Sequence, residues 1–181
     1  MTGTDGRLPL LRETVRPEWI DYNGHLSEAF YVLVFGHATD ALMAEAGLDA
    51  GYRARTGCSL YTVEAHLRYL REVTEGARLV VRTRVLGVDA KRVRCAHEMF
   101  AERPQDPEDG AGAAGDDTVD TGDTVPAGGP VATAELLALH VDQEAGRAVP
   151  LPEQPHAVLA GLTGPAPGWA GRSVGAVPRP E

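Results

Sequence analysis

Residues 19–31 read WIDYNGHLSEAFY, and they mark the start of the longest helix that the sequence predicts. Asp21, Asn23 and His25 surround Gly24 in a turn that is expected to open directly into this helix. The first backbone N–H groups of a helix are unpaired and lie at the positive end of its dipole. A carboxylate placed beside them can act as a base or a nucleophile next to an oxyanion site. The segment therefore indicates a reaction centre within one short peptide.

The helix itself is expected to run from His25 to Ala46, with Asn23 as its cap and Gly47 as its stop. Its apolar side chains populate more than one face of the helix: Leu26, Ala29, Phe30, Leu33, Val34, Ala38, Ala41 and Leu42. A helix that is apolar nearly all round is typical of a protein core. The sequence therefore predicts a central, almost fully buried helix.

Strand-like runs lie on both sides of the helix. A short run at 8–15 precedes it, a short helix at 49–56 follows it, and further strands are expected at 59–70, 79–86, 92–101 and 131–141. In the run at 59–70, apolar and polar residues alternate with a period of two. A strand, a long helix and four strands in sequence give an α+β pattern. We expect an antiparallel sheet wrapped around the central helix.

Two segments interrupt or follow this pattern. Residues 104–130 hold seven acids, no Lys or Arg and no aromatic residue, and without them the net charge of −9 becomes −2. Such a composition buries too little to offset the entropy of ordering, so a disordered acidic insertion is expected there. We therefore expect one domain at 1–151, with residues 152–181 forming a Pro/Gly-rich C-terminal tail.

Composition excludes several classes of protein. A net charge of −9 argues against nucleic-acid binding, which needs a basic face. Polar residues interrupt the longest apolar segment, so no membrane span is expected. The two cysteines, Cys58 and Cys95, lie far apart and suggest neither a disulfide framework nor a metal site. The N-terminus does not resemble a signal peptide, and a cytoplasmic protein is expected.

The turn and its helix, the run SLYTVEAHLRYLR at 59–71, and the runs ATAE at 132–135 and HVD at 140–142 resemble the hotdog-fold acyl-CoA thioesterases. Within them the chain resembles the 4-hydroxybenzoyl-CoA thioesterase-like branch, and most of all the betainyl-CoA thioesterases of carnitine breakdown. The resemblance implies hydrolysis of a small acyl-CoA thioester, with no cofactor beyond the coenzyme A of the substrate. It also implies a homodimer or homotetramer with the active site between protomers.

The resemblance assigns Asp21 the place of the family's catalytic acid. Thioester hydrolysis needs a carboxylate that attacks the carbonyl or one that deprotonates water, and the sequence leaves both open. Gly24 and the N–H groups after it are candidate oxyanion donors, although a glycine also simply permits a turn. Asn23 either orients Asp21 or water, or it caps the helix. His25 polarises the carbonyl, pairs with Asp21, or is satisfied by a backbone carbonyl.

Two side chains of the run at 59–71 are further candidates. Glu64 and His66 project from one face of their strand, and Glu64 is a candidate second acid or base facing a neighbouring protomer. An interface salt bridge with Arg68 or Arg71 explains Glu64 equally simply.

Aromatic and basic side chains supply the candidate binding residues. A quaternary ammonium acyl group would be held by aromatic faces, for which Trp19, Tyr22 and Tyr61 are the candidates. One basic cluster near a strand turn comprises Lys91, Arg92 and Arg94. These side chains either bind the phosphates of coenzyme A or form a solvated strand edge.

Two other functions compete with hydrolysis. A hotdog hydratase or dehydratase also uses Asp and His chemistry, but here the acid precedes the helix in a thioesterase-like turn. A non-catalytic acyl-CoA-binding protein would have no need of Asp21.

Overall fold

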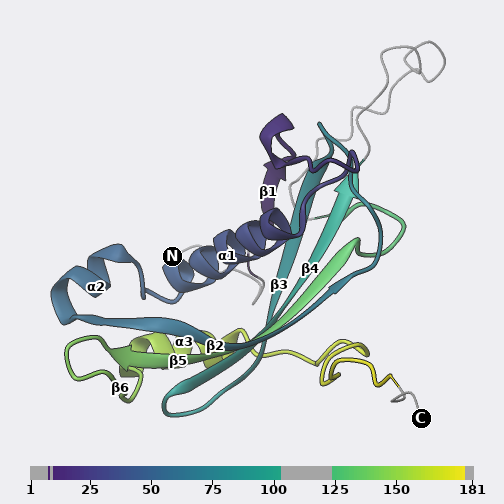
Figure 1. Ribbon diagram of the computed structural model, residues 1–181. Coiled ribbons are helices and arrows are strands. Elements are labelled where there is room, and N and C mark those ends of the chain that lie inside the picture. The colour runs from purple at the N-terminus through teal and green to yellow at the C-terminus, as the bar shows by residue number, and fades with distance from the viewer. Residues whose placement is uncertain (1–7, 9, 103–123, 178–181) are drawn as a thin grey trace.

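The computed structural model describes residues 8, 10–102 and 124–177 (Figure 1). In chain order the helices and strands are β1 (Leu11–Thr14), the short 3₁₀ helix η1 (Pro17–Trp19), α1 (Glu28–Glu45), α2 (Ala50–Thr56), β2 (Cys58–Tyr69), β3 (Arg78–Val88), β4 (Arg92–Glu102), β5 (Ala132–Asp142), β6 (Arg147–Ala148) and α3 (Glu153–Gly161). The strands and the two helices expected from the sequence are therefore present, with shifted ends.

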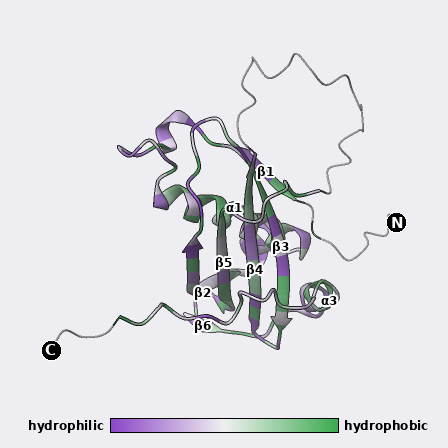
Figure 2. Ribbon diagram, turned by 90° about the vertical axis from the view of Figure 1, so that its right-hand side faces the viewer, coloured by the Kyte–Doolittle hydropathy of each residue, from purple (hydrophilic) through white to green (hydrophobic). Residues whose placement is uncertain are grey.

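The strands form one antiparallel sheet in the order β1-β3-β4-β5-β2, and β6 adds to β5. The long strands carry both hydrophilic and hydrophobic residues (Figure 2). Two bulges interrupt the ladders, one between Thr62 and Glu64 and one between Val85 and Gly87. Bulges bend a strand and increase its twist, which suits a sheet that curls around a helix. This is the α+β architecture that the order of elements predicts.

The central helix α1 packs against the sheet with one face (Figure 1). That face carries Tyr31, Val34, Phe35, Ala38 and Leu42, which recur at the spacing of a single helical stripe. The opposite face is open in the single chain, where Val32 is 49% and Leu33 41% exposed. The prediction of burial all round is therefore wrong for one chain, because apolar residues on the second face lie away from its sheet.

A polar cluster lies in the core between α1 and the sheet. The ring of His97 is fully buried, stacks on Phe35, and lies between the hydroxyls of Thr39 and Thr83. Thr39 donates its hydrogen to the carbonyl of Phe35, so its oxygen accepts from Nε2–H of His97. Thr83 then donates to Nδ1 of His97 over 2.9 Å. Burial lowers the pKa of His97 to about 4, so the ring is neutral at pH 7.

The segment after residue 151 contains a helix that the sequence analysis did not predict. Leu159 of α3 is fully buried, and α3 lies beside β3 (Figure 2). Thr163 and Gly164 then pair with Val85, so they cover a part of the β3 edge that β1 leaves free. Further on, Trp169 donates to the carboxylate of Glu98 over 3.1 Å. The described part of the tail is thus attached to the sheet.

One expectation falls partly outside the described residues. Most of the acidic insertion expected at 104–130 lies at 103–123, which the structure does not describe. The described chain resumes at Thr124, and Val131 then donates its N–H to the carbonyl of Met99 over 2.7 Å and enters the sheet beside β4. Within the described ranges, no helix has the length and apolar character of a membrane span.

Candidate active site

The turn at 21–25 is a tight hairpin closed by backbone hydrogen bonds. The N–H of Asp21 donates to the carbonyl of His25 over 2.9 Å, and the N–H of Gly24 donates to the carbonyl of Asp21 over 3.0 Å. Gly24 has a φ of 81°, a left-handed conformation that glycine adopts without strain. The carboxylate of Asp21 accepts the backbone N–H of Asn23 over 2.8 Å and faces its side-chain amide at 3.5 Å. Asn23 therefore orients Asp21, one of the two roles that the sequence left open.

The helix does not begin where the sequence predicted. It starts at Glu28 with Ser27 as its N-cap, so Asn23 is not its cap and His25 lies outside it. Leu26 and Ser27 intervene and donate their N–H groups to backbone carbonyls. The N–H of Gly24 is likewise occupied. The turn therefore uses the N–H of Gly24 for its own closure, and the oxyanion role expected of Gly24 and the N–H groups after it stays a prediction.

His25 contacts an acid other than Asp21. Its Nε2 lies 3.2 Å from Oε2 of Glu72, in the segment that follows β2. Leu26 donates its N–H to Val73 over 2.8 Å, so the turn is attached along that segment. Neither the pair with Asp21 nor satisfaction by a backbone carbonyl describes this contact. The pair with Glu72 keeps the imidazole beside the turn.

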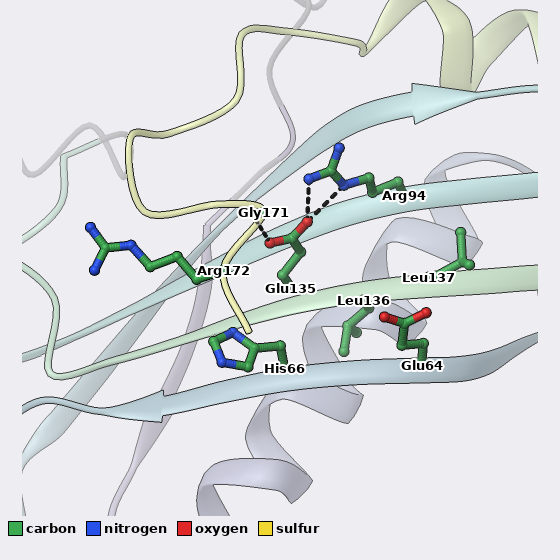
Figure 3. Close-up of a pocket in the computed structure, with 8 residues that line it drawn as sticks. All are labelled: Glu64, His66, Arg94, Glu135, Leu136, Leu137, Gly171 and Arg172. Atoms are coloured by element: carbon green, nitrogen blue, oxygen red, sulfur yellow. Dashed lines mark hydrogen bonds and ion pairs between the residues drawn. The ribbon is translucent and has the colours of Figure 1, made fainter. Parts of the chain in front are cut away.

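Glu64 and His66 line a different region, a cavity of about 290 Å³ (Figure 3). Its lining comprises Glu64, His66, Arg94, Glu135, Leu136, Leu137, Gly171 and Arg172. Glu135 is held by Arg94, whose Nε donates over 2.7 Å, and by the N–H of Gly171 over 2.6 Å. The half-buried His66 has a buried Nδ1 without a hydrogen-bond partner.

This cavity lies on the face of the sheet that points away from α1. In the ladder, His66 is opposite Glu135 and Glu64 opposite Leu137, whereas the alternate residues Ala134 and Leu136 belong to the core under α1. Asp21 lies beside the segment after β2, at the start of α1. One chain therefore does not bring Glu64 to its own turn at 21–25. The second acid or base role toward a neighbouring protomer, and the alternative of an interface salt bridge with Arg68 or Arg71, stay predictions.

The basic residues expected to hold coenzyme A each have a partner in the chain. Arg92 donates through Nε to Asp89 over 2.7 Å, Lys91 donates to the carbonyl of Ala148 over 3.2 Å, and Arg94 pairs with Glu135. The hydrogen bonds to Asp89, above all that from Arg92, lower the pKa of this carboxyl to about 2. The β3–β4 turn thus explains Lys91 and Arg92 without a ligand.

The three aromatic residues expected to form a cage lie apart. Trp19 is buried beneath Arg16 and stacks on Phe30 at 5.4 Å between ring centres. Tyr22, at the tip of the turn, is 97% exposed. Tyr61 lies near the start of β2, where its hydroxyl contacts Gln143. Within one chain, Trp19, Tyr22 and Tyr61 therefore do not form the predicted cage. Trp19 belongs to the core, and Tyr61 lies at the end of β2 that is remote from the turn at 21–25.

Other aromatic and acidic residues do gather near the turn, and the sequence analysis did not select them. Tyr69, the last residue of β2, donates to the carboxylate of Glu28, the first residue of α1, over 3.2 Å. The ring of Tyr31 meets that of Tyr69 edge-on, with centres 5.2 Å apart. A pairing between the end of a strand and the start of a helix has no local sequence signal. In the described part of the chain, no cluster of His, Cys, Asp or Glu fits a metal ion.

Comparison with known proteins supplies the family. A model of the thioesterase-like superfamily matches residues 15–160. The chain is 40% identical over 169 residues to the betainyl-CoA thioesterase of Pseudomonas aeruginosa, covering 91% of this chain and 92% of that protein. It is 42% identical over 177 residues to the L-carnitine dehydrogenase/betainyl-CoA thioesterase of Agrobacterium fabrum, covering 96% of this chain and 31% of that longer protein.

A solved structure supports the fold. The protein SAV2348 of Staphylococcus aureus, determined in complex with CoA, superimposes with a TM-score of 0.76 at 22% identity, over 98% of this chain and 100% of that one. The α+β hotdog fold expected from the sequence is thereby confirmed. With its oriented aspartate ahead of the central helix, this chain belongs to the thioesterase-like superfamily and is a hotdog-fold thioester hydrolase.

Proposed function

We propose that this enzyme hydrolyses betainyl-CoA to glycine betaine and free coenzyme A, with Asp21 as the acting carboxylate. The observation that carries the proposal is the carboxylate of Asp21, held by Asn23 at 2.8 Å in a chain 40% identical to a betainyl-CoA thioesterase over 91% of its length. The hydrogen bond from the backbone of Asn23 fixes Oδ1 of Asp21, and Oδ2 makes the longer contact with the side-chain amide of Asn23. The remaining lone pairs of the carboxylate can take a proton from water or attack a carbonyl carbon.

The chemical step joins the oxygen of water to the acyl carbon and breaks the C–S bond, and the thiolate of coenzyme A leaves and takes up a proton. Asp21 promotes it in one of two ways. It deprotonates the attacking water, or it attacks first and forms a mixed anhydride that water then opens. His25, held by Glu72, lies within the same turn, where it can polarise the carbonyl. Neither route requires a cofactor beyond the substrate's own coenzyme A.

The substrate is tested with a neutral isostere. Betainyl-CoA and 3,3-dimethylbutanoyl-CoA have acyl groups of the same shape and differ in one charge. We expect kcat/KM to be about tenfold or more higher for betainyl-CoA, the preference that cation–aromatic and charge contacts provide. Release of the free thiol measures both rates. Equal rates for the two substrates would remove betainyl-CoA as the preferred substrate and leave the thioester hydrolase in place.

We further propose that the enzyme assembles as a homodimer, or as a tetramer of such dimers. Among the described strands β2 is an edge strand that pairs on one side with β5. The chain also exposes apolar side chains of β2 and of the outer face of α1, namely Tyr61, Val63, Val32 and Leu33. Edge strands and contiguous apolar surfaces are sites of association. A second copy would bury both and bring the two turns at 21–25 into one assembly.

The assembly is tested by placing a charge on this surface. We expect the parent to sediment as a dimer or tetramer at micromolar concentration. Leu33→Asp should shift it to a monomer and remove most of its activity, because a buried unpaired carboxylate destabilises the interface. Val174→Asp is the control, since Val174 is an exposed tail residue. A monomeric parent, or a fully assembled Leu33→Asp variant, would contradict the proposed surface.

The proposed reaction also fits a place in the cell. Coenzyme A thioesters are made and used in the cytoplasm, and we propose that the enzyme acts there. Cys58 and Cys95 are both free thiols, which a reducing compartment would preserve.

A further inference from the structure

We propose that Tyr69 and Glu28 form the subsite that recognises the trimethylammonium group of the acyl chain, with Tyr31 positioning the ring of Tyr69. The inference rests on the proposed function and replaces the cage of Trp19, Tyr22 and Tyr61. A trimethylammonium group cannot donate hydrogen bonds, so its recognition depends on aromatic faces and on nearby negative charge. These two features occur together where β2 ends and α1 begins.

The ring of Tyr69 is fixed at both of its ends. Its hydroxyl donates to Oε1 of Glu28 over 3.2 Å, and Tyr31 packs edge-on against its ring, with centres 5.2 Å apart. Tyr31 is itself buried and donates its hydroxyl to the carbonyl of Arg71. A ring held in this way loses little further freedom when it binds a ligand. Tyr69 is nevertheless 44% exposed, so part of the ring remains open to solvent.

The electrostatics suit a cation. Glu28 is an exposed carboxylate beside the ring, and Glu72 lies close enough to Tyr31 to act on its hydroxyl. Burial, followed by the charge of Glu28, raises the pKa of Tyr69 to about 12, so the phenol stays neutral and keeps donating to Glu28. The hydrogen bond in turn holds the carboxylate at the rim of the ring. A cation above the ring thus meets an aromatic face and a negative charge together.

The subsite lies beside the catalytic turn. Only Leu26 and Ser27 separate the turn at 21–25 from Glu28, and the N–H of Leu26 donates to the carbonyl of Val73. His25 contacts Glu72, and Tyr31 contacts the carbonyl of Arg71. Residues 71–73 therefore touch both the turn that carries Asp21 and the helix end that carries Glu28. In betainyl-CoA one methylene separates the acyl carbon from the ammonium nitrogen, so a cation subsite for this substrate must adjoin the turn that carries Asp21.

The experiment measures the ratio of kcat/KM for betainyl-CoA to that for 3,3-dimethylbutanoyl-CoA in the full chain. Tyr69→Leu removes the aromatic face, and we expect this ratio to fall about tenfold through the rate with betainyl-CoA. Tyr69→Phe keeps the ring and should retain most of the ratio. Glu28→Gln should lower it several-fold. Glu153→Gln is the matched control, since Glu153 is the first residue of α3 and loses the same charge.

The outcomes separate this inference from the proposed function. If the parent prefers betainyl-CoA and Tyr69→Leu loses that preference while it still hydrolyses the neutral substrate, the subsite is supported. If Tyr69→Leu slows both substrates equally, or keeps the preference, Tyr69 does not recognise the cation and the inference is overturned, although the proposed function stands. If the parent itself does not hydrolyse betainyl-CoA, the proposed function fails, and the inference fails with it.

Discussion

Asp21→Asn is expected to reduce kcat by about 100-fold or more, with little change in the binding of the coenzyme A portion. The substitution preserves the volume of the side chain, and its amide oxygen can still accept the N–H of Asn23 that now holds the carboxylate at 2.8 Å. What is removed is the charge that deprotonates water or attacks the carbonyl. The loss therefore belongs to the transition state, and it is measured as thiol release at saturating substrate.

Glu64→Gln is the matched control for this change. Glu64 lines the cavity on the face of the sheet away from α1, beside Glu135 and His66 (Figure 3). We expect this variant to keep activity close to that of the parent, because its carboxylate is on the other side of the sheet from the turn in the same chain. If Asp21→Asn remained near the parent's activity while Glu64→Gln did not, the assignment of the two acids would be reversed. The cavity in Figure 3 would then be the reaction centre.

The contrast between these two acids shows what sequence could give for the site. The carboxylate of Asp21 and its orienting Asn23 are two residues apart, so their contact follows from the local turn. The faces of a strand also follow from its period of two, and Glu64 and His66 do share one face. Which face covers the helix depends on the whole sheet. The period of two therefore predicts correctly that Glu64 and His66 share a face, and the position of Glu64 toward a neighbouring protomer stays a prediction.

The aromatic residues show the same limit more strongly. Trp19 and Tyr22 flank Asp21 along the chain, which suggested a cage around the reacting group. In the structure Trp19 stacks on Phe30 within the core and Tyr22 points to solvent. Tyr69, 48 positions after Asp21 in the sequence, reaches Glu28 at the start of the helix. Only the pairing of β2 with the rest of the sheet brings it there, and no short motif encodes such a pairing.

For the fold, the strong signals were the long apolar helix and the alternating strands, and both are present. The end of the helix at Glu45 agrees with the glycine stop, whereas its start was set three residues too early, because the hairpin at 21–25 closes on itself before the helix begins. Helix α3 has only nine residues between prolines and glycines, so its pattern is weak. Its buried Leu159 is fixed by tertiary contact with the sheet.

Acid is expected to destabilise the protein through His97, a residue outside the reaction centre. The groups that face its ring are the hydroxyls of Thr39 and Thr83, the thiol of Cys95 at 3.9 Å and the ring of Phe35. None of them is negatively charged, since burial raises the pKa of the Cys95 thiol to about 12. A protonated imidazole would therefore have no counterion at this place in the core. Protonation of His97 thus favours the unfolded chain, in which water solvates the charge.

The sign and the size of the effect follow from linkage. The pKa of His97 falls from 6.5 in the unfolded chain to about 4 in the folded one, so between these values the unfolded chain binds a proton that the folded chain does not. The free energy of unfolding should be unaffected by this group above pH 6.5 and fall by about 3 kcal/mol as the pH is lowered to 4. Urea unfolding at pH 7 and at pH 4.5, at fixed salt and protein concentration, measures the loss.

His97→Gln is the control. It is expected to be less stable than the parent at pH 7, because it leaves the contacts of Thr39 and Thr83 imperfect. On acidification it should lose about 2 kcal/mol less of its free energy of unfolding than the parent. Carboxylates that titrate over the same range affect both proteins equally and cancel in this difference. An equal loss in the parent and in His97→Gln would show that His97 does not carry the acid sensitivity.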